Sequence, residues 1–250
     1  MDVIEAAALG KRYGRKKWGL RDCTLSVPAG CVTGLVGPNG SGKTTLLSLA
    51  VGMIRPTAGT VRVAGEAAGS RAARELTAFV AQDAPLYQNL PVRDMLRVAR
   101  NLNARWDHGR AVSRLDGLGI ALKQRVGALS GGQQAQLALT IALARRPELL
   151  VLDEPLAALD PLARADFMRS VRAAVAEDQI SAVFSTHVIA ELEQVADHLI
   201  VLGRGAVLLS GTTAGLAAAH GEASPEQVIL SALRENARDH ARDHAQGAAR

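Results

Sequence analysis

The sequence contains little cysteine. Cys23 and Cys31 are the only two cysteines in 250 residues; they do not form a CxxC pair, and no histidine lies near them. A disulfide scaffold needs several paired cysteines, and a structural zinc site needs closely spaced cysteines or histidines. The sequence therefore favours neither class, and we expect two reduced cysteines that serve in packing.

Long apolar runs are also lacking. The longest apolar stretch, LALTIALA at residues 137–144, is far shorter than the ~18 residues that a membrane span needs. Asp2 and Glu5 stand where a signal peptide would be basic. We expect no membrane-spanning segment, so any work at a membrane would require a separate membrane protein.

Aromatic residues are scarce and charge is modest. Aromatic residues make up 3% of the chain and hydrophobic residues 48%, so the core must be aliphatic. This composition suits buried parallel strands packed against Ala-rich helices. The net charge of +5 is small for 250 residues and is better explained by solubility than by a nucleic-acid partner, which we do not expect.

What the chain does contain is an alternation of short apolar runs with stretches of helical period, which is typical of α/β architecture. The expected strands are residues 3–9, 23–27, 31–36, 60–64, 77–81, 149–153, 182–186, 198–202 and 206–209. The first two and residues 60–64 lie among Pro and Gly turn signals and are expected to be antiparallel. The later strands are expected to form a mostly parallel sheet.

The domain organisation follows from the same pattern. Residues 91–129 have a helical pattern only, at 92–103, at 109–118 and then into the turn LSGGQ. We therefore predict one domain at 1–220 with a helical subdomain inserted at about 91–135. Residues 221–250 become polar and are expected to be a solvated C-terminal tail.

The stretch GPNGSGKT, residues 37–44, fits GxxxxGKT and lies between an expected strand and an expected helix. Its glycines let successive backbone N–H groups point inward at phosphate oxygens, and the helix N-terminus adds partial positive charge. Lys43 would then reach the β- and γ-phosphates, and Thr44 would offer its hydroxyl to Mg²⁺. The predicted nucleotide-binding residues here are Gly37, Pro38, Asn39, Gly40, Ser41, Gly42, Lys43, Thr44 and Thr45.

A second motif, LLVLDE, is an apolar strand that ends in two carboxylates. Because neighbouring side chains of a strand point to opposite faces, Asp153 and Glu154 are expected to have different roles. Asp153 could hold Mg²⁺, and Glu154 could orient and deprotonate an attacking water.

A third motif, LSGGQ, precedes the apolar stretch QLALTIALA. Ser130 is expected to be the N-cap of a helix that runs to about residue 145, with Gly131 and Gly132 in its first turn. A helix start of this kind is a second possible anion site. Taken alone, the pattern is better explained by a simple cap.

In this order the motifs resemble those of the ATP-binding-cassette (ABC) family of ATPases. The order is GPNGSGKT, Gln82 in FVAQD, LSGGQ, LLVLDEP, Asp160 in ALD, and His187 in FSTH, and the resemblance covers about residues 1–220. It implies a P-loop NTPase core of mostly parallel sheet, with an antiparallel β subdomain and an inserted helical subdomain. Two such domains close head to tail over two ATP molecules, so the LSGGQ turn of one contacts the γ-phosphate bound by the other.

The resemblance also implies residue roles. The catalytic residues would be Glu154, His187 and Gln82. Tyr13 would stack on adenine, and the residues reaching the partner's nucleotide or the dimer seam would be Ser130, Gly131, Gly132, Gln133 and Asp160. The Mg²⁺ ligands would be Thr44, Gln82 and Asp153.

By the same resemblance, the chain would be the ATPase subunit of a transporter at the cytoplasmic face of the cell membrane. Its partners would be a separate transmembrane subunit and a second nucleotide-binding domain, either an identical chain or a paralogue. The short stretch after residue 220 and the phrase NLPVRDMLRVAR favour export over import. Two alternatives stay open: an ABC ATPase acting on nucleic acid, ribosomes or a soluble assembly machine, and a catalytically silent regulatory cassette.

Overall fold

The computed structural model describes residues 1–14, 17–82, 85–189, 192, 195–219 and 224–247, with side chains as far as residue 238. Its larger sheet has six strands in the order β10-β9-β3-β8-β7-β6. All neighbours in this sheet are parallel except β9 and β10. The strands are β3 (Val32–Val36), β6 (Thr77–Val80), β7 (Leu149–Asp153), β8 (Ser181–Thr186), β9 (His198–Gly203) and β10 (Ala206–Thr212).

The smaller sheet is antiparallel and has the order β2-β1-β4-β5. Its strands are β1 (Asp2–Tyr13), β2 (Lys17–Pro28), β4 (Ala58–Val63) and β5 (Glu66–Ala67). The expected combination of a mostly parallel core and an antiparallel β subdomain is therefore confirmed. β1 and β2 are longer than expected, because their pairing continues beyond Leu9 and Cys23 as far as Tyr13 and Lys17.

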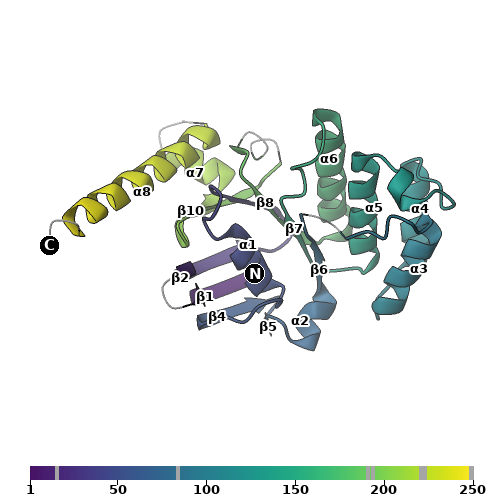
Figure 1. Ribbon diagram of the computed structural model, residues 1–250, viewed down its shortest axis with the longest axis horizontal. Helices are drawn as coiled ribbons and strands as arrows, with labels where there is room; N and C mark the ends of the chain where they lie inside the picture. Colours follow the sequence, from purple (N-terminus) through teal and green to yellow (C-terminus); the bar gives the residue numbers. More distant parts are fainter. Residues whose placement is uncertain (15–16, 83–84, 190–191, 193–194, 220–223, 248–250) are drawn as a thin grey trace.

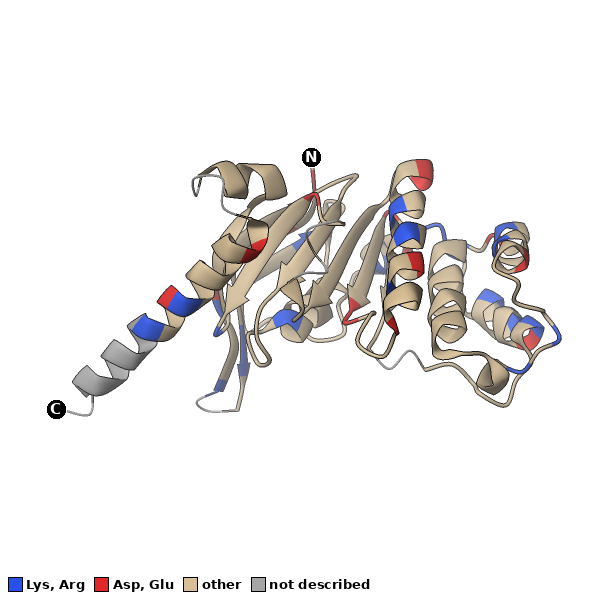
Figure 2. Cartoon of the chain, turned by 90° about the horizontal axis from the view of Figure 1, so that it is seen from above, with Lys and Arg blue, Asp and Glu red and all other residues tan. Residues whose placement is uncertain are grey.

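The parallel strands are apolar throughout because both faces of their sheet are covered. In β7, Leu150 and Leu152 belong to a core cluster with α5 and α6, whereas Leu149 and Val151 belong to a cluster with α1 and the antiparallel sheet. The helices concerned are α1 (Lys43–Ala50), α5 (Gly131–Ala144) and α6 (Pro161–Asp178). The charged residues lie mainly on the outer helices and on the strands of the smaller sheet (Figure 2).

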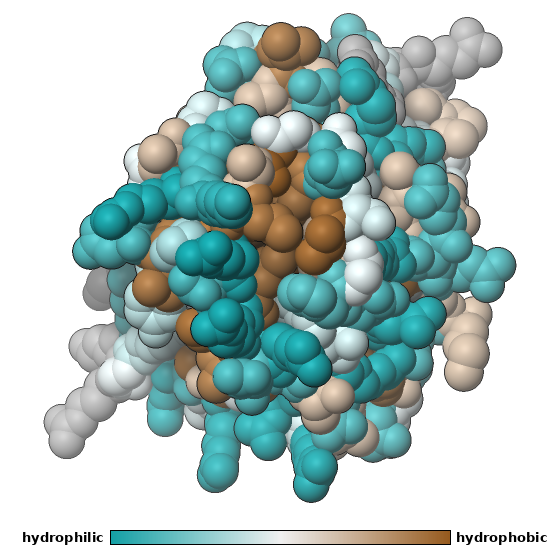
Figure 3. Space-filling view, turned by 90° about the vertical axis from the view of Figure 1, so that its right-hand side faces the viewer, coloured by the Kyte–Doolittle hydropathy of each residue, from teal (hydrophilic) through white to brown (hydrophobic). Residues whose placement is uncertain are grey.

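The helical side of the molecule has an apolar core of its own. It contains α3 (Val92–Leu102), α4 (His108–Gly117) and the short η1 (Val126–Ala128), close to the helices expected there. Arg110 of α4 forms an ion pair with Asp178 at the end of α6, which ties this layer to the main body. Figure 3 shows apolar residues gathered near the centre of the face on this side, bordered by hydrophilic ones. The proposed subdomain limits of 91–135 remain a prediction.

The C-terminal stretch differs from the expected solvated tail. After α2 (Arg71–Leu76) and α7 (Thr213–Ala219), the last helix is α8 (Pro225–Gly247). Val228 and Ile229 of α8 are buried in the main core, and Leu233 packs against it. Burying the apolar side chains of QVILSAL removes them from water, which lowers the free energy of the folded chain. This part of the C-terminal stretch therefore packs against the main body. The polar remainder of α8 projects from the body (Figure 1).

Both cysteines are free, as expected, and Cys23 is buried. The Cys23 thiol donates to the carbonyl oxygen of Gly205 over 3.0 Å, and burial raises the pKa of this thiol. Within the described residues, no helix has the length and apolar character that crossing a membrane requires.

His198 gives the fold a predicted weakness in acid. It is buried, its Nδ1 has no hydrogen-bond partner among the described residues, and burial lowers its pKa below the ordinary 6.5, against a smaller opposing effect of Asp2. The unfolded state therefore binds the proton more readily, so stability is lost as pH falls through about 6.5. We expect His198→Leu to reduce this loss, measured by denaturant unfolding at pH 7.5 and pH 5.

His108→Gln, at the exposed start of α4, is the control for the His198 experiment. It should lose stability in acid as the wild type does. An acid-side loss in His198→Leu equal to that of the wild type would show that other groups set it.

Candidate active site

The loop between β3 and α1 has the curled backbone that its sequence predicts. Gly42 adopts a φ of +109°, and a Cβ there would lie 2.7 Å from the carbonyl oxygen of Gly19. At Gly37, a Cβ would lie 2.3 Å from the carbonyl oxygen of Leu202. Only glycine fits either position, so the motif is required by this backbone. α1 begins directly afterwards at Lys43, with its N-terminal N–H groups at the loop.

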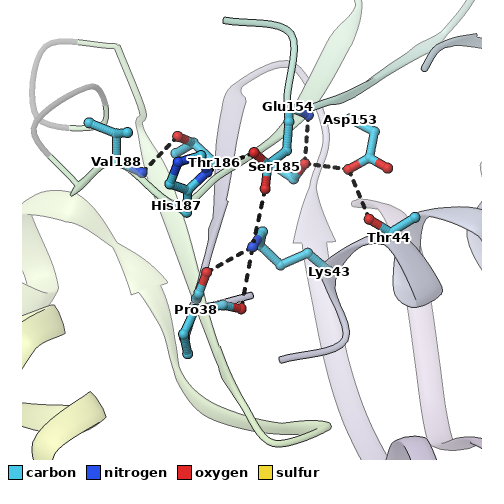
Figure 4. Close-up of polar contacts among 10 residues, drawn as sticks. Pro38, Lys43, Thr44, Asp153, Glu154, Ser185, Thr186, His187 and Val188 are labelled. Atoms are coloured by element: carbon cyan, nitrogen blue, oxygen red, sulfur yellow. Dashed lines mark hydrogen bonds and ion pairs between the residues drawn. The ribbon is translucent and has the colours of Figure 1, made fainter. Parts of the chain in front are cut away.

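Lys43 is the cation at the centre of the site, and only 5% of its side chain is exposed. Its Nζ donates to the carbonyl oxygen of Gly37 over 2.8 Å and lies 3.4 Å from Glu154 Oε1. The other carboxylate oxygen of Glu154 lies 2.7 Å from Nδ1 of His187. Figure 4 shows the three side chains converging from α1, β7 and β8. The structure thus brings together three residues that are far apart in the sequence, since 144 positions separate Lys43 from His187 and Glu154 lies between them.

The carboxylates of Asp153, the last residue of β7, and of Glu154, the next residue, have different partners, as strand alternation predicts. Asp153 is buried and accepts from the hydroxyl of Thr44 over 3.4 Å. Glu154 instead faces Lys43, and its φ of +47° shows that the strand has ended at this residue. A positive φ is uncommon for a residue with a side chain. The direction of Glu154 therefore depends on a local backbone feature in addition to alternation.

A cleft of about 770 Å³ joins these groups to the β1–β2 hairpin. Its lining residues are Tyr13, Lys17, Trp18, Gly19, Asn39, Gly40, Gly42, Lys43, Thr44, Thr45, Gln82, Glu154, Ala157 and His187. Most of the predicted residues of one nucleotide site are therefore gathered around one cavity. The exposed rings of Tyr13 and Trp18 are part of this lining.

Sequence reasoning missed several residues at the hairpin side of the cleft. Lys17 pairs with Tyr13 across the hairpin and lines the cleft. Gly19 matters because a Cβ there would lie 2.7 Å from the Tyr13 ring, so glycine lets this ring lie against β2. The Tyr13 hydroxyl lies 3.4 Å from Oγ1 of Thr45. Which residues of the hairpin line the cleft depends on how β1 and β2 pair, and the sequence alone does not give this pairing.

The LSGGQ turn lies at a different cavity. Ser130 is the N-cap of α5: its Oγ accepts from the Gln133 N–H over 3.2 Å, and Gln133 Oε1 accepts from the Ser130 N–H over 3.0 Å. This reciprocal capping box confirms the predicted helix start. Ser130, Gly132, Gln133 and Asp160 line a cavity of about 400 Å³, in which Asp160 caps α6. These residues are therefore not gathered with Lys43.

The family model for ABC transporters matches residues 20–157, which is more than half of the chain. The chain belongs to the ABC transporter family. It is 32% identical to a phosphonates import ATP-binding protein of Thiobacillus denitrificans, over 87% of this chain and 90% of that protein. It is 34% identical to an Fe(3+) ions import ATP-binding protein of Pseudomonas fluorescens, over 84% of this chain.

The chain spans 62% of the length of that iron protein and 66% of an uncharacterised ABC transporter ATP-binding protein of Nostoc, so less than two thirds of these curated relatives. A solved structure, the ATP binding subunit of an ABC transporter, superposes with a TM-score of 0.81 over 92% of this chain at 24% identity. This likeness shows a shared fold. The chain therefore carries the ATP-binding, ATP-hydrolysing module of the ABC family.

The expectation of export over import is contradicted by these relatives. The curated relatives at 32% and 34% identity are named as import proteins. The expectation used two features of the ATP-binding chain, the stretch after residue 220 and NLPVRDMLRVAR. Both features belong to the ATP-binding chain itself, and the names of the relatives outweigh them.

Proposed function

We propose that this chain powers a transporter whose membrane-spanning part is a separate protein, by binding and hydrolysing ATP between two nucleotide-binding domains. The observation that carries the proposal is the convergence of Lys43, Glu154 and His187 at the mouth of the phosphate-binding loop. A cation that binds phosphate and a carboxylate that can accept the proton of a water molecule are groups that serve phosphoryl transfer to water.

In the proposed reaction, a water oxygen forms a bond to the γ-phosphorus while the bond from phosphorus to the β-bridging oxygen breaks. ADP leaves with that electron pair, and Glu154 accepts the proton of the attacking water. Lys43 stabilises the negative charge of the phosphates, and its burial strengthens this interaction. Nδ1 of His187 holds the Glu154 carboxylate at 2.7 Å, and the ring lines the same cleft, where it can contact the γ-phosphate.

Mg²⁺ fits the oxygen groups of this site. No group of three or more His, Cys, Asp or Glu residues in the described part of the chain could hold a metal alone. Oxygens of Thr44 and Asp153 nevertheless converge to 3.4 Å beside the cradle, and oxygen ligands shared with phosphates and water are what Mg²⁺ prefers. Thr44, Asp153 and Gln82 would hold it, and when bound it neutralises charge on the β- and γ-phosphates.

The separate cavity at the LSGGQ turn supports an arrangement of two domains. Ser130 and the N-terminus of α5 form an anion-attracting helix start that lacks a lysine of its own. In the proposed head-to-tail dimer, this turn completes the cleft of the partner copy or of a paralogue. Asp160, which lines the same cavity as Ser130, then lies at the seam.

A membrane partner is supported by the surface on the helical side. Apolar residues gather there inside a hydrophilic border (Figure 3), and such areas are typical of protein contacts. A hollow of about 220 Å³ beside α2 and α3 is lined by four arginines, Arg71, Arg74, Arg105 and Arg145, and by Glu75, which forms an ion pair with Arg71. Burial lowers the pKa of Arg145. We propose that the membrane subunit docks on this side, at the cytoplasmic face of the membrane, with acidic side chains facing these arginines.

The proposed function is tested first by Lys43→Ala. Loss of charged hydrogen bonds to phosphate should weaken ATP binding about ten- to hundredfold, as measured by titration calorimetry, and should abolish phosphate release. Lys123→Ala, an exposed lysine outside the cleft, is the matched control. Wild-type affinity in Lys43→Ala would contradict the site. Co-purification of a polytopic membrane protein with the tagged chain would support the transporter assignment, whereas co-purification of ribosomes or nucleic acid would oppose it.

A further inference from the structure

Ser185 lies beside the C-terminal end of β7, next to Asp153 and Glu154. The sequence motifs did not single it out. It is on β8, its side chain is fully buried, and it is the register partner of Asp153 in the parallel pair of β7 and β8. Its Oγ donates to Asp153 Oδ1 over 2.6 Å. The same Oγ accepts the backbone N–H of Glu154 over 2.8 Å.

One hydroxyl can serve two such partners because it has one proton to donate and lone pairs to accept with. The bond to Asp153 involves a charged acceptor in a buried site, where hydrogen bonds are strong. It fixes the rotation of the carboxylate whose Oδ1 also accepts from Thr44 at 3.4 Å. Removing the hydroxyl would free this carboxylate to turn away from the phosphate cradle.

The bond to Glu154 acts on the backbone. Glu154 has a φ of +47°, a conformation that costs energy for a residue with a Cβ and persists only where neighbours hold it. The Ser185 hydroxyl holds the peptide N–H of this residue. With that peptide fixed, the Glu154 side chain reaches both Lys43 at 3.4 Å and His187 at 2.7 Å.

We propose that Ser185 is a positioning residue for ATP hydrolysis, which aligns Asp153 and Glu154 at once; this inference rests on the proposed function. Ser185 touches neither the loop glycines nor Lys43 in its two hydrogen bonds. It therefore affects the step that needs the two carboxylates and leaves the binding of ATP largely intact.

Ser181 offers a matched comparison on the same strand. It is also buried, and its Oγ accepts from the N–H of Gly30 over 2.9 Å. Its place is the first residue of β8, at the opposite end from the site. A serine that matters only for packing or for satisfying a buried polar group should behave like Ser181.

The test compares Ser185→Ala, Ser185→Cys and Ser185→Thr with Ser181→Ala. We expect Ala and Cys at position 185 to lower kcat about ten- to hundredfold, the effect of losing a hydrogen bond to a charged group. We expect KM for ATP and the ATP affinity, followed by fluorescence of Trp18 in the cleft, to change less than about threefold. The Mg²⁺ concentration for half-maximal activity should rise, and Ser185→Thr, which keeps the hydroxyl, should restore kcat.

Several results would overturn the positioning role. If the wild type is active and Ser185→Ala has the same kcat, the positioning role is refuted and the proposed function stands. An equal fall of kcat in Ser181→Ala would also overturn the positioning role, as would a parallel change of kcat, ATP affinity and melting temperature that Thr does not rescue. A wild type without ATPase activity would instead overturn the proposed function and the positioning role with it. If Ser185→Ala does not fold, Ser185→Cys carries the same test with a side chain of similar volume.

Discussion

Glu154→Gln should lower the rate of ATP hydrolysis at least about hundredfold, which is the usual contribution of a general base. The amide cannot accept the proton of the attacking water. ATP binding should persist or become tighter, since Lys43 Nζ would no longer lie 3.4 Å from a competing carboxylate. Phosphate release and titration calorimetry measure the two effects. In the proposed head-to-tail dimer, hydrolysis ends the closed state, so light scattering should detect a dimer that accumulates with Mg-ATP.

Glu148→Gln is the control for this experiment. Glu148 is exposed and immediately precedes β7, at the opposite end of the strand from Glu154, so the same chemical change there should leave hydrolysis unaltered. A Glu154→Gln protein that hydrolyses ATP at the wild-type rate would refute the assignment of the base. If the wild type bound ATP but hydrolysed none, the chain would fit the catalytically silent cassette instead.

Features encoded by contiguous residues could be predicted from the sequence. The apolar run of β7 ends at Asp153 as expected, because a strand covered on both faces shows a continuous apolar pattern. The helix after LSGGQ begins where Ser130 and Gln133 form their capping box, four residues that contain the whole signal. The phosphate-binding loop is likewise local, since its glycines and Lys43 follow one another in the chain.

Features that depend on pairing of distant segments could not be predicted in this way. Ser185 reaches Asp153 only because β7 and β8 pair in one particular register. Lys17 lines the cleft because it pairs with Tyr13 across the β1–β2 hairpin. In α8, the apolar residues Val228, Ile229 and Leu233 decide the docking, and their partner surface is assembled from elements earlier in the chain.

A mixture of two inactive variants, Lys43→Ala and Ser130→Arg, should regain ATPase activity that neither has alone. In the proposed head-to-tail dimer, each site takes Lys43 from one chain and Ser130 from the other. A mixed dimer therefore contains one intact site. With random exchange, about half of the dimers are mixed and one site in two works, so about a quarter of wild-type activity should return.

Ser130→Arg replaces the N-cap hydroxyl, so the variant should lose about 0.5–2 kcal/mol of stability and still bind ATP through its own Lys43. Binding must be measured before mixing. The control is Ser130→Arg mixed with the double variant Lys43→Ala/Ser130→Arg, in which no site is intact and no activity should return. If both single variants fold, Ser130→Arg binds ATP and the mixture stays inactive, the LSGGQ turn serves the fold of its own chain. Recovered activity would instead explain why this helix start, in a cavity apart from the phosphate-binding loop, needs no lysine.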